Sequence, residues 1–164
     1  MKSKNLNLYQ LHQVVSLDLE TTDKIESSKK DLPHIVSFGA CSYDFKLFHT
    51  YVTPYDPDCV FTMKASSINK VTRQSLYQKP ESERPVFHRA WKQFLQWLDE
   101  IGYDLTEPIV LCAFNGFNFD FKLILHHLEL YKESYELRKI YLVDPFFNGK
   151  AGDKQNLSDF QTQF

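Results

Sequence analysis

The fold class follows from one octapeptide, residues 13–20, which reads QVVSLDLE. Its β-branched content and its alternation of apolar and polar residues predict a β-strand. Val15, Leu17 and Leu19 would face one side of this strand, while Asp18 and Glu20 would leave the other side together. Because the residues around the two acids are apolar, we expect this strand at the centre of a sheet rather than at its edge.

Two further strands follow the first one closely. Residues 34–43 and 47–53 read as strands, and the three residues between them are enough only for a short turn. A polar connection, residues 21–33, precedes them. Links this short predict an antiparallel three-strand meander.

The rest of the chain alternates helices and strands. Helices are expected over residues 66–71, 86–100 and 118–131, and strands over residues 108–114 and 138–144. Asn118 is the expected cap of the third helix, and the apolar run at 108–114 is typical of a strand buried on both faces. This order predicts an α/β fold in which parallel strands extend the meander and helices cover the faces.

Composition excludes several classes of protein. The 164 residues fit one domain, and the 15% aromatic content supplies a large core. Lys and Arg number 19 against 21 Asp and Glu, a formal charge of −2, which excludes a strongly basic coat for duplex nucleic acid. The three cysteines form no CxxC pair, so buried free thiols are expected. Since no run of about 18 apolar residues occurs, we expect a soluble cytoplasmic or nuclear protein without a membrane partner.

Three acidic residues are candidates for a metal site. Asp18 and Glu20 share one face of a central strand, where they either need a cation or lie at a solvent-facing end. Asp120 follows a buried strand and falls in the first turn of a helix, where an acid either binds a ligand or complements the helix dipole. If the two strands are neighbours, three carboxylates converge, and such oxygen clusters suit Mg²⁺ or Mn²⁺.

Two segments, in order, resemble the motifs of a known family. SLDLETT at residues 16–22 resembles motif I of the DEDD (DnaQ-like) superfamily of 3′–5′ exonucleases, and NGFNFD at residues 115–120 resembles motif II. Further matches to the strands and helix of that family are residues 51–54, 67–72 and 142–145. The resemblance covers residues 13–160 and implies an RNase H-like mixed sheet, an antiparallel three-strand meander plus parallel strands, flanked by helices.

The resemblance also implies a reaction. The family hydrolyses a phosphodiester at a 3′ end with two divalent ions, so the expected substrate is single-stranded DNA or RNA and the expected cofactors are two Mg²⁺ or Mn²⁺ ions. Carried over residue by residue, it implies that Asp18 bridges both ions, Glu20 holds one and helps position the attacking water, and Asp120 holds the other. One ion would generate hydroxide, and the other would stabilise the leaving 3′-oxygen.

A substrate pocket beside these acids is the third implication. Its expected residues are Leu19, Thr21, Thr22, Asn115 and Phe119. The main-chain N–H groups near the two threonines would contact the terminal nucleotide, while Asn115 and Phe119 would shape the pocket. Phe117 either stacks on a base or belongs to the core. Asp23 and Lys24 stand where the family usually has Gly and Leu, which makes the substrate loop atypical.

The end of the chain departs further from the family pattern. Motif III, a helix that carries a His or Tyr base and a fourth metal-binding Asp, would follow a segment like residues 156–160, but the chain ends at Phe164. His126 and His127 are expected to be ordinary residues of the motif II helix. We therefore expect a single exonuclease-like domain, residues 1–164, without the motif III helix.

Two functions of different class follow from this expectation. The first is a metal-dependent 3′–5′ exonuclease that is truncated, or completed by a partner chain such as a second copy, or poorly active. Loss of a general base lowers a rate by about 10²–10⁴-fold. The second is a catalytically impaired exonuclease-fold module that binds nucleic acid or a protein partner.

Overall fold

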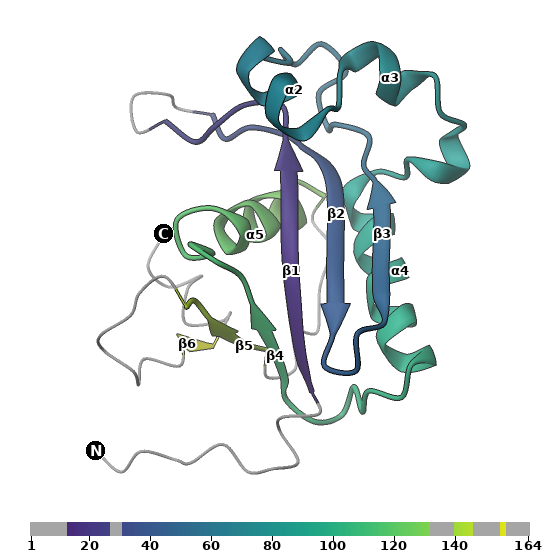
Figure 1. Ribbon diagram of the computed structural model, residues 1–164, viewed down its shortest axis with the longest axis vertical. Coiled ribbons are helices and arrows are strands. Elements are labelled where there is room, and N and C mark those ends of the chain that lie inside the picture. The colour runs from purple at the N-terminus through teal and green to yellow at the C-terminus, as the bar shows by residue number, and fades with distance from the viewer. Residues whose placement is uncertain (1–12, 27–30, 132–139, 146–154, 157–164) are drawn as a thin grey trace.

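Six strands form one mixed sheet in the computed structural model, which describes residues 13–26, 31–131, 140–145 and 155–156 (Figure 1). The strands are β1 (Val14–Thr21), β2 (Ile35–Ser42), β3 (Leu47–Tyr51), β4 (Ile109–Cys112), β5 (Ile140–Val143) and β6 (Gln155–Asn156). Their order across the sheet is β3-β2-β1-β4-β5-β6, so β1 is central as its sequence predicts.

The pairing directions confirm the expected topology. β1, β2 and β3 form an antiparallel meander, and β4 and β5 extend it with parallel pairs on the other side of β1. β6 pairs antiparallel with β5 and was not expected, because two residues are too few to show a periodic pattern. The result is an RNase H-like α/β sheet in which β1 has a neighbour on each side.

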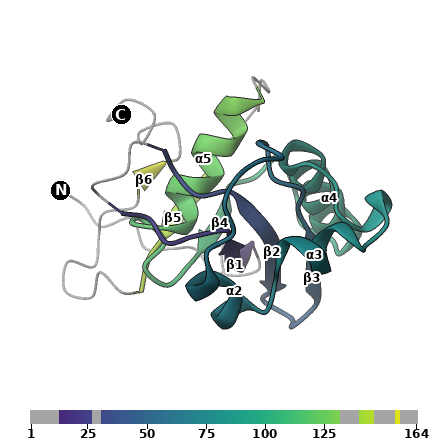
Figure 2. The ribbon, with the colours of Figure 1, turned by 90° about the horizontal axis from the view of Figure 1, so that it is seen from above.

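Helices lie on one face of this sheet and at one end of it. They are α2 (Met63–Asn69), α3 (Arg73–Tyr77), a 3-10 turn at Glu81–Glu83, α4 (Phe87–Glu100) and α5 (Asp120–Leu130). α4 and α5 cover the same face, whereas α2 and α3 lie beyond the carboxyl end of β1 (Figures 1 and 2). We call the opposite face of β1, β2 and β3, which neither α4 nor α5 covers, the open face.

Aromatic side chains fill the core between α4 and the meander. The ring centroid of Phe38 on β2 lies 5.0 Å from that of Phe94 and 5.4 Å from that of Phe48, within the range of favourable aromatic pairs. Phe87 and Trp91 on α4 extend the cluster. This packing fixes α4 across β2 and β3 and accounts for much of the high aromatic content.

The short helices differ from the one helix expected at residues 66–71: α2 begins earlier, and α3 was not expected. α2 starts at Met63 rather than at Ser66, because the Thr62 hydroxyl accepts a hydrogen bond from Ala65 N at 3.3 Å and caps the helix. α3 is a separate helix with a capping box, in which Thr72 and Ser75 each bind the other's main-chain N–H. Both caps lie among other Ser, Thr and Asn residues that could also cap a helix, which hid the boundaries.

Asn118 does not cap α5, so that prediction is wrong. The helix begins at Asp120, and Phe119 occupies the cap position without a side-chain hydrogen bond. The Asn118 side chain instead donates to Asn115 Oδ1 at 2.8 Å. The loop before the helix therefore uses its amide groups to stabilise itself.

Two composition-based expectations can be compared with the structure. All three cysteines are free thiols, but only Cys59 is buried, while Cys41 and Cys112 are half-buried. Cys41 and Cys112 lie in one row with Ser16, on the face of the sheet away from α4 and α5, which explains their partial exposure. In the described part of the chain, no helix combines the length and apolar character that a bilayer-spanning helix needs.

Candidate active site

The site forms where β1 runs past the end of β4. The parallel pairing joins Val14 to Val110, Val15 to Leu111 and Ser16 to Cys112 and stops there, although β1 continues to Thr21. After β1 the chain continues into β2 on one side of it, while β4 lies on its other side. In α/β sheets this arrangement opens a crevice at the carboxyl ends of the strands.

Asp120 closes this crevice from the α5 side. Its Oδ1 accepts a hydrogen bond from the main-chain N–H of Leu19 at 3.0 Å. That N–H has no β4 residue beside it, and a buried main-chain donor needs a partner. Asp120 is only 3% exposed. The hydrogen bond therefore fixes the Asp120 carboxylate against the segment of β1 that carries Asp18 and Glu20.

The three acidic groups influence one another. Burial raises the pKa of Asp120 to about 7, and the charges of Asp18 and Asp144 raise it too, against the opposing effect of the Leu19 N–H. Burial also raises the pKa of Asp18. The pKa of Glu20 is raised by burial first and then by the charge of Asp18. A cation bound here would relieve both the burial and the repulsion.

The donor chemistry of these acids fits a divalent cation. Carboxylate oxygens are the ligands that Mg²⁺ and Mn²⁺ prefer, and no ion pair with a described lysine or arginine involves Asp18, Glu20 or Asp120. However, among the described residues no three acidic, histidine or cysteine side chains converge closely enough to form a ready-made metal cage. The three carboxylates thus do not by themselves form a complete coordination shell for a metal ion.

Asp144 supports the loop that leads into Asp120. It follows β5, and its two carboxylate oxygens accept hydrogen bonds from Asn115 N at 2.8 Å and Phe117 N at 3.1 Å. Asn115 has a left-handed backbone with φ of 58°, a conformation that Asn tolerates well. Sequence reasoning gave Asp144 no role, although an acid at the carboxyl end of a parallel strand was a usable signal.

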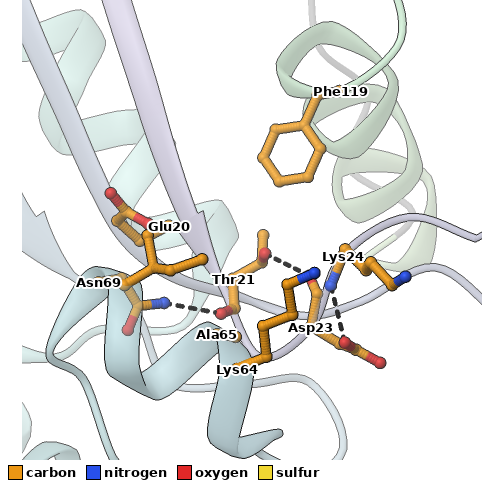
Figure 3. A pocket seen from close by; sticks show the side chains of 9 residues that line it. Glu20, Thr21, Asp23, Lys24, Lys64, Ala65, Asn69 and Phe119 are labelled. Atoms are coloured by element: carbon orange, nitrogen blue, oxygen red, sulfur yellow. Dashed lines mark hydrogen bonds between the residues drawn. The ribbon is translucent and has the colours of Figure 1, made fainter.

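A pocket of about 160 Å³ lies next to the acids, between the end of β1, α2 and the start of α5 (Figure 3). It is lined by Glu20, Thr21, Asp23, Lys24, Lys64, Ala65, Ile68, Asn69 and Phe119. The Phe119 ring faces the pocket from the side opposite α2 (Figure 3). The lining combines an apolar wall with two lysines, which suits a ligand with a flat apolar part and a negative charge.

The expected pocket residues divide into two groups. Thr21 and Phe119 line the pocket, whereas Leu19, Thr22 and Asn115 do not. Leu19 belongs to the core and contributes its main-chain N–H to Asp120. The Asn115 side chain accepts the Asn118 amide instead.

The polar groups of Thr22 already form hydrogen bonds within the protein. Its N–H donates to the His34 carbonyl at 2.9 Å, and its hydroxyl accepts from His34 N at 3.1 Å. The Thr22 carbonyl accepts from Thr62 N at 2.9 Å. In this conformation the Thr22 main-chain N–H is therefore already bonded within the protein, and a contact of N–H groups near Thr21 and Thr22 with a terminal nucleotide stays a prediction.

The α2 side of the pocket was missed by sequence reasoning. The Asn69 amide donates to the Thr21 carbonyl at 2.9 Å, and its Oδ1 accepts from Val71 N at 2.9 Å, so this side chain ties α2 to the end of β1. Lys64 and Ile68 reach the pocket from the same helix. Nothing in the spacing of these residues indicates a contact with a strand more than 40 positions earlier.

The fold of this sheet and its helices is similar to that of solved DEDD 3′–5′ exonuclease domains. No family model and no curated protein matches the sequence. Among solved structures, the nuclease domain of 3′hExo, a DEDDh family member bound to rAMP, has a TM-score of 0.57 at 14% identity over 74% of this chain. A second structure, a 3′-exonuclease that recognises the histone mRNA stem-loop, has a TM-score of 0.61 at 14% identity over 80% of this chain.

A bacterial enzyme has a similar fold as well. E. coli Exonuclease I in complex with a dT13 oligonucleotide has a TM-score of 0.54 at 15% identity over 80% of this chain, and another of its structures is described as a zinc-bound form with single-stranded DNA. The chain spans 60% of the 3′hExo chain, 58% of the histone mRNA exonuclease chain and 27% of the Exonuclease I chain. At these identities the likeness establishes the fold alone.

Proposed function

We propose that this chain is a metal-dependent 3′–5′ exonuclease domain that hydrolyses phosphodiesters at the 3′ end of single-stranded DNA or RNA. The observation that carries the proposal is the hydrogen bond between Asp120 and Leu19 N. It joins the acid at the first position of α5 to the strand that carries Asp18 and Glu20. Two sequence motifs that are far apart thus meet at one end of the sheet.

Each residue of the cluster has a proposed role. Asp18, Glu20 and Asp120 would hold two Mg²⁺ or Mn²⁺ ions, which supply hydroxide near neutral pH and stabilise the leaving 3′-oxygen. Leu19 N orients Asp120, and Asp144 holds the loop before it.

The pocket would receive the terminal nucleotide. Phe119 offers a flat surface on which a base can stack. Lys64 makes no ion pair with the described residues and reaches the pocket from α2, where it would attract the phosphate. Both DNA and RNA are substrates to test.

A second candidate function rests on the open arrangement of the acids. Since no three described ligand side chains form a ready-made cage, the chain would alternatively bind a single strand or a protein partner without hydrolysis. This candidate predicts binding that survives removal of divalent cations. The first candidate predicts binding of Mn²⁺ and shortening of the strand from its 3′ end.

The deciding experiment is digestion of 5′-fluorescent single-stranded DNA and RNA with Mg²⁺ or Mn²⁺. We expect a ladder that shortens from the 3′ end, and at least a 10²-fold lower rate for Asp18→Ala. Asp99→Ala, an exposed acid on α4, serves as the control and should retain the wild-type rate. Calorimetric titration with Mn²⁺ gives a readout that does not depend on turnover. Equal rates for the wild type and Asp18→Ala would overturn the proposal.

A further inference from the structure

The open face carries two rows of side chains that lead away from the acids. The register of β1, β2 and β3 places Asp18 opposite Gly39 and Gly39 opposite His49. The next row places Glu20 opposite Ser37 and Ser37 opposite Tyr51. The rows are therefore Asp18–Gly39–His49 and Glu20–Ser37–Tyr51. Each begins with a proposed metal ligand on β1 and ends with an aromatic side chain on β3.

The first row has open space in its middle, and we call this space above Gly39, between Asp18 and His49, the trough. Gly39 has no side chain, and a Cβ at this position would meet nothing nearer than the Asp18 carbonyl at 3.7 Å. Ser37, in the middle of the second row, is buried, so the trough does not extend over that row. The floor of the trough is thus low between the acidic strand and the aromatic strand, which are two strand spacings of about 4.8 Å apart.

The aromatic side of the trough is held in place by its neighbours. The imidazole Nε2 of His49 lies 3.0 Å from the Ser37 hydroxyl, and the His49 ring packs edge-on against Tyr51 with centroids 5.0 Å apart. His49 is nonetheless exposed. An exposed ring in a fixed orientation is a surface on which a base can stack at low entropic cost.

A lysine lies next to this ring. Lys79 Nζ is 4.1 Å from the centroid of the Tyr51 ring, a cation–π contact, and no carboxylate of the described residues forms an ion pair with it. The cations around it are already bonded. Arg73 donates to the Pro57 and Cys59 carbonyls, and the Arg84 side chain donates to the Lys79 carbonyl at 2.9 Å. Lys79 therefore has an ammonium group that remains available to an anion.

The segment of the chain that carries Lys79 has an excess of basic residues. Residues 62–85 contain five basic and two acidic side chains, in a chain whose formal charge is −2. The basic residues are Lys64, Lys70, Arg73, Lys79 and Arg84. A local basic segment beside an exposed aromatic ring, here that of His49, is typical of surfaces that bind single-stranded nucleic acid.

We propose that this trough binds the part of a single strand that precedes its 3′ end. The proposal rests on the proposed function, which places the scissile phosphodiester at Asp18 and Glu20. A base above Gly39 stacks on His49, and Lys79, held by Tyr51, binds a backbone phosphate. A strand long enough to reach β3 then gains contacts that a dinucleotide cannot make.

The test compares two lengths of single strand in EDTA, where no hydrolysis occurs. Fluorescence anisotropy measures the dissociation constants of 5′-fluorescein octathymidylate and dithymidylate for the full chain. We expect Lys79→Gln and His49→Ala each to weaken binding of the octamer three- to tenfold and to leave the dimer unchanged. Lys79→Gln should also lower the salt dependence of octamer binding by about 0.7, the value for one phosphate of a single strand.

The control is Lys92→Gln on α4, which removes an exposed lysine from the opposite face, and its affinity should equal that of the wild type. Melting by circular dichroism verifies that the variants are folded. Unchanged octamer affinity in either trough variant, or an equal loss for the dimer, overturns the proposal even if the wild type is an active nuclease. Absence of hydrolysis by the wild type overturns the proposed function. The binding differences would then still determine whether the trough binds a single strand.

Discussion

Asp120 and Leu19 are 101 positions apart in the sequence, yet the Asp120 carboxylate accepts the Leu19 N–H at 3.0 Å. A carboxylate with this partner cannot turn away from β1 without leaving a buried main-chain donor unsatisfied, a loss of about 1–3 kcal/mol. The hydrogen bond thus links the position of a proposed metal ligand to the stability of the sheet. Four predictions follow from this site and its surroundings.

Asp120→Asn separates the structural role of this residue from its charge. The Asn oxygen can still accept from Leu19 N, so the fold should persist while hydrolysis falls at least 10²-fold.

Because the pKa of Asp120 is raised to about 7, the folded state holds its proton more tightly than the unfolded state. The contribution to stability is complete below about pH 4 and is lost as the pH rises through 7. We therefore expect the variant to be more stable than the metal-free wild type at pH 8 by about 1–3 kcal/mol, measured by urea unfolding. A less stable variant at pH 8 would contradict this account.

Gly116→Ala tests how closely the loop before α5 packs. A Cβ at Gly116 would lie 2.6 Å from a ring carbon of Phe121 and 2.8 Å from the Ala113 Cβ, so the free energy of unfolding should fall by about 2–3 kcal/mol. Gly39→Ala is the matched control, since its Cβ meets only the Asp18 carbonyl at 3.7 Å. It should leave stability unchanged or raise it by up to about 1 kcal/mol. Similar losses in the two variants would show that packing is not the cause.

Asp144→Ala removes both acceptors of the loop that carries Asn115 and Phe117. We expect a loss of about 1–3 kcal/mol in the free energy of unfolding. We also expect a larger fall in kcat than in affinity, because the loop positions Asp120 rather than touching the substrate. Asp144→Asn retains a single acceptor and should be intermediate in both measurements. Full activity in the Ala variant would contradict a positioning role for Asp144.

His127 should make the protein sensitive to acid. Burial lowers its pKa to about 3. Its Nδ1 donates to the Leu123 carbonyl at 2.9 Å, and its Nε2 accepts from Ile35 N at 3.4 Å, an arrangement that only the neutral ring permits. The unfolded state therefore binds the extra proton, and stability is lost as the pH falls below about 6.5. His34 and His126, whose pKa values are also lowered mainly by burial, act in the same direction.

The measurement for His127 is the free energy of unfolding between pH 7 and pH 5. The wild type should lose up to about 1.4 kcal/mol per pH unit from this residue, and His127→Leu should remove that part of the slope. An unchanged slope in His127→Leu would show that the histidine titrates normally in the folded state.

The sheet and the large helices could be predicted because their patterns are local. The alternation at Leu17, Asp18 and Leu19 depends only on the strand period, and the structure confirms that Leu17 and Leu19 are buried. The amphipathic helix expected at residues 86–100 is α4, which begins at Phe87. Short links also determined the meander, because they leave no room for a crossover.

The wrong prediction lies where a polar side chain has a competing partner. Asn118 has the chemistry of a helix cap, but its amide donates to Asn115, three residues earlier, and the helix begins at Asp120 instead. Hydrogen-bonding chemistry alone does not show which of two possible partners a side chain takes. The main-chain N–H of Thr22 has such a partner as well, since it is bonded to His34.

The wall of the pocket that α2 forms contributes little to the core. The helix has no buried residue, and it is joined to β1 by polar contacts such as that between Asn69 and the Thr21 carbonyl. Substitutions at Lys64 or Ile68 therefore change the pocket without opening a cavity in the protein. Selection for another terminal nucleotide, in nature or in directed evolution, would find its most permissive positions on this helix. α2 is in that sense an exchangeable part of the molecule, and grafting a different helix there would alter substrate preference on an unchanged sheet.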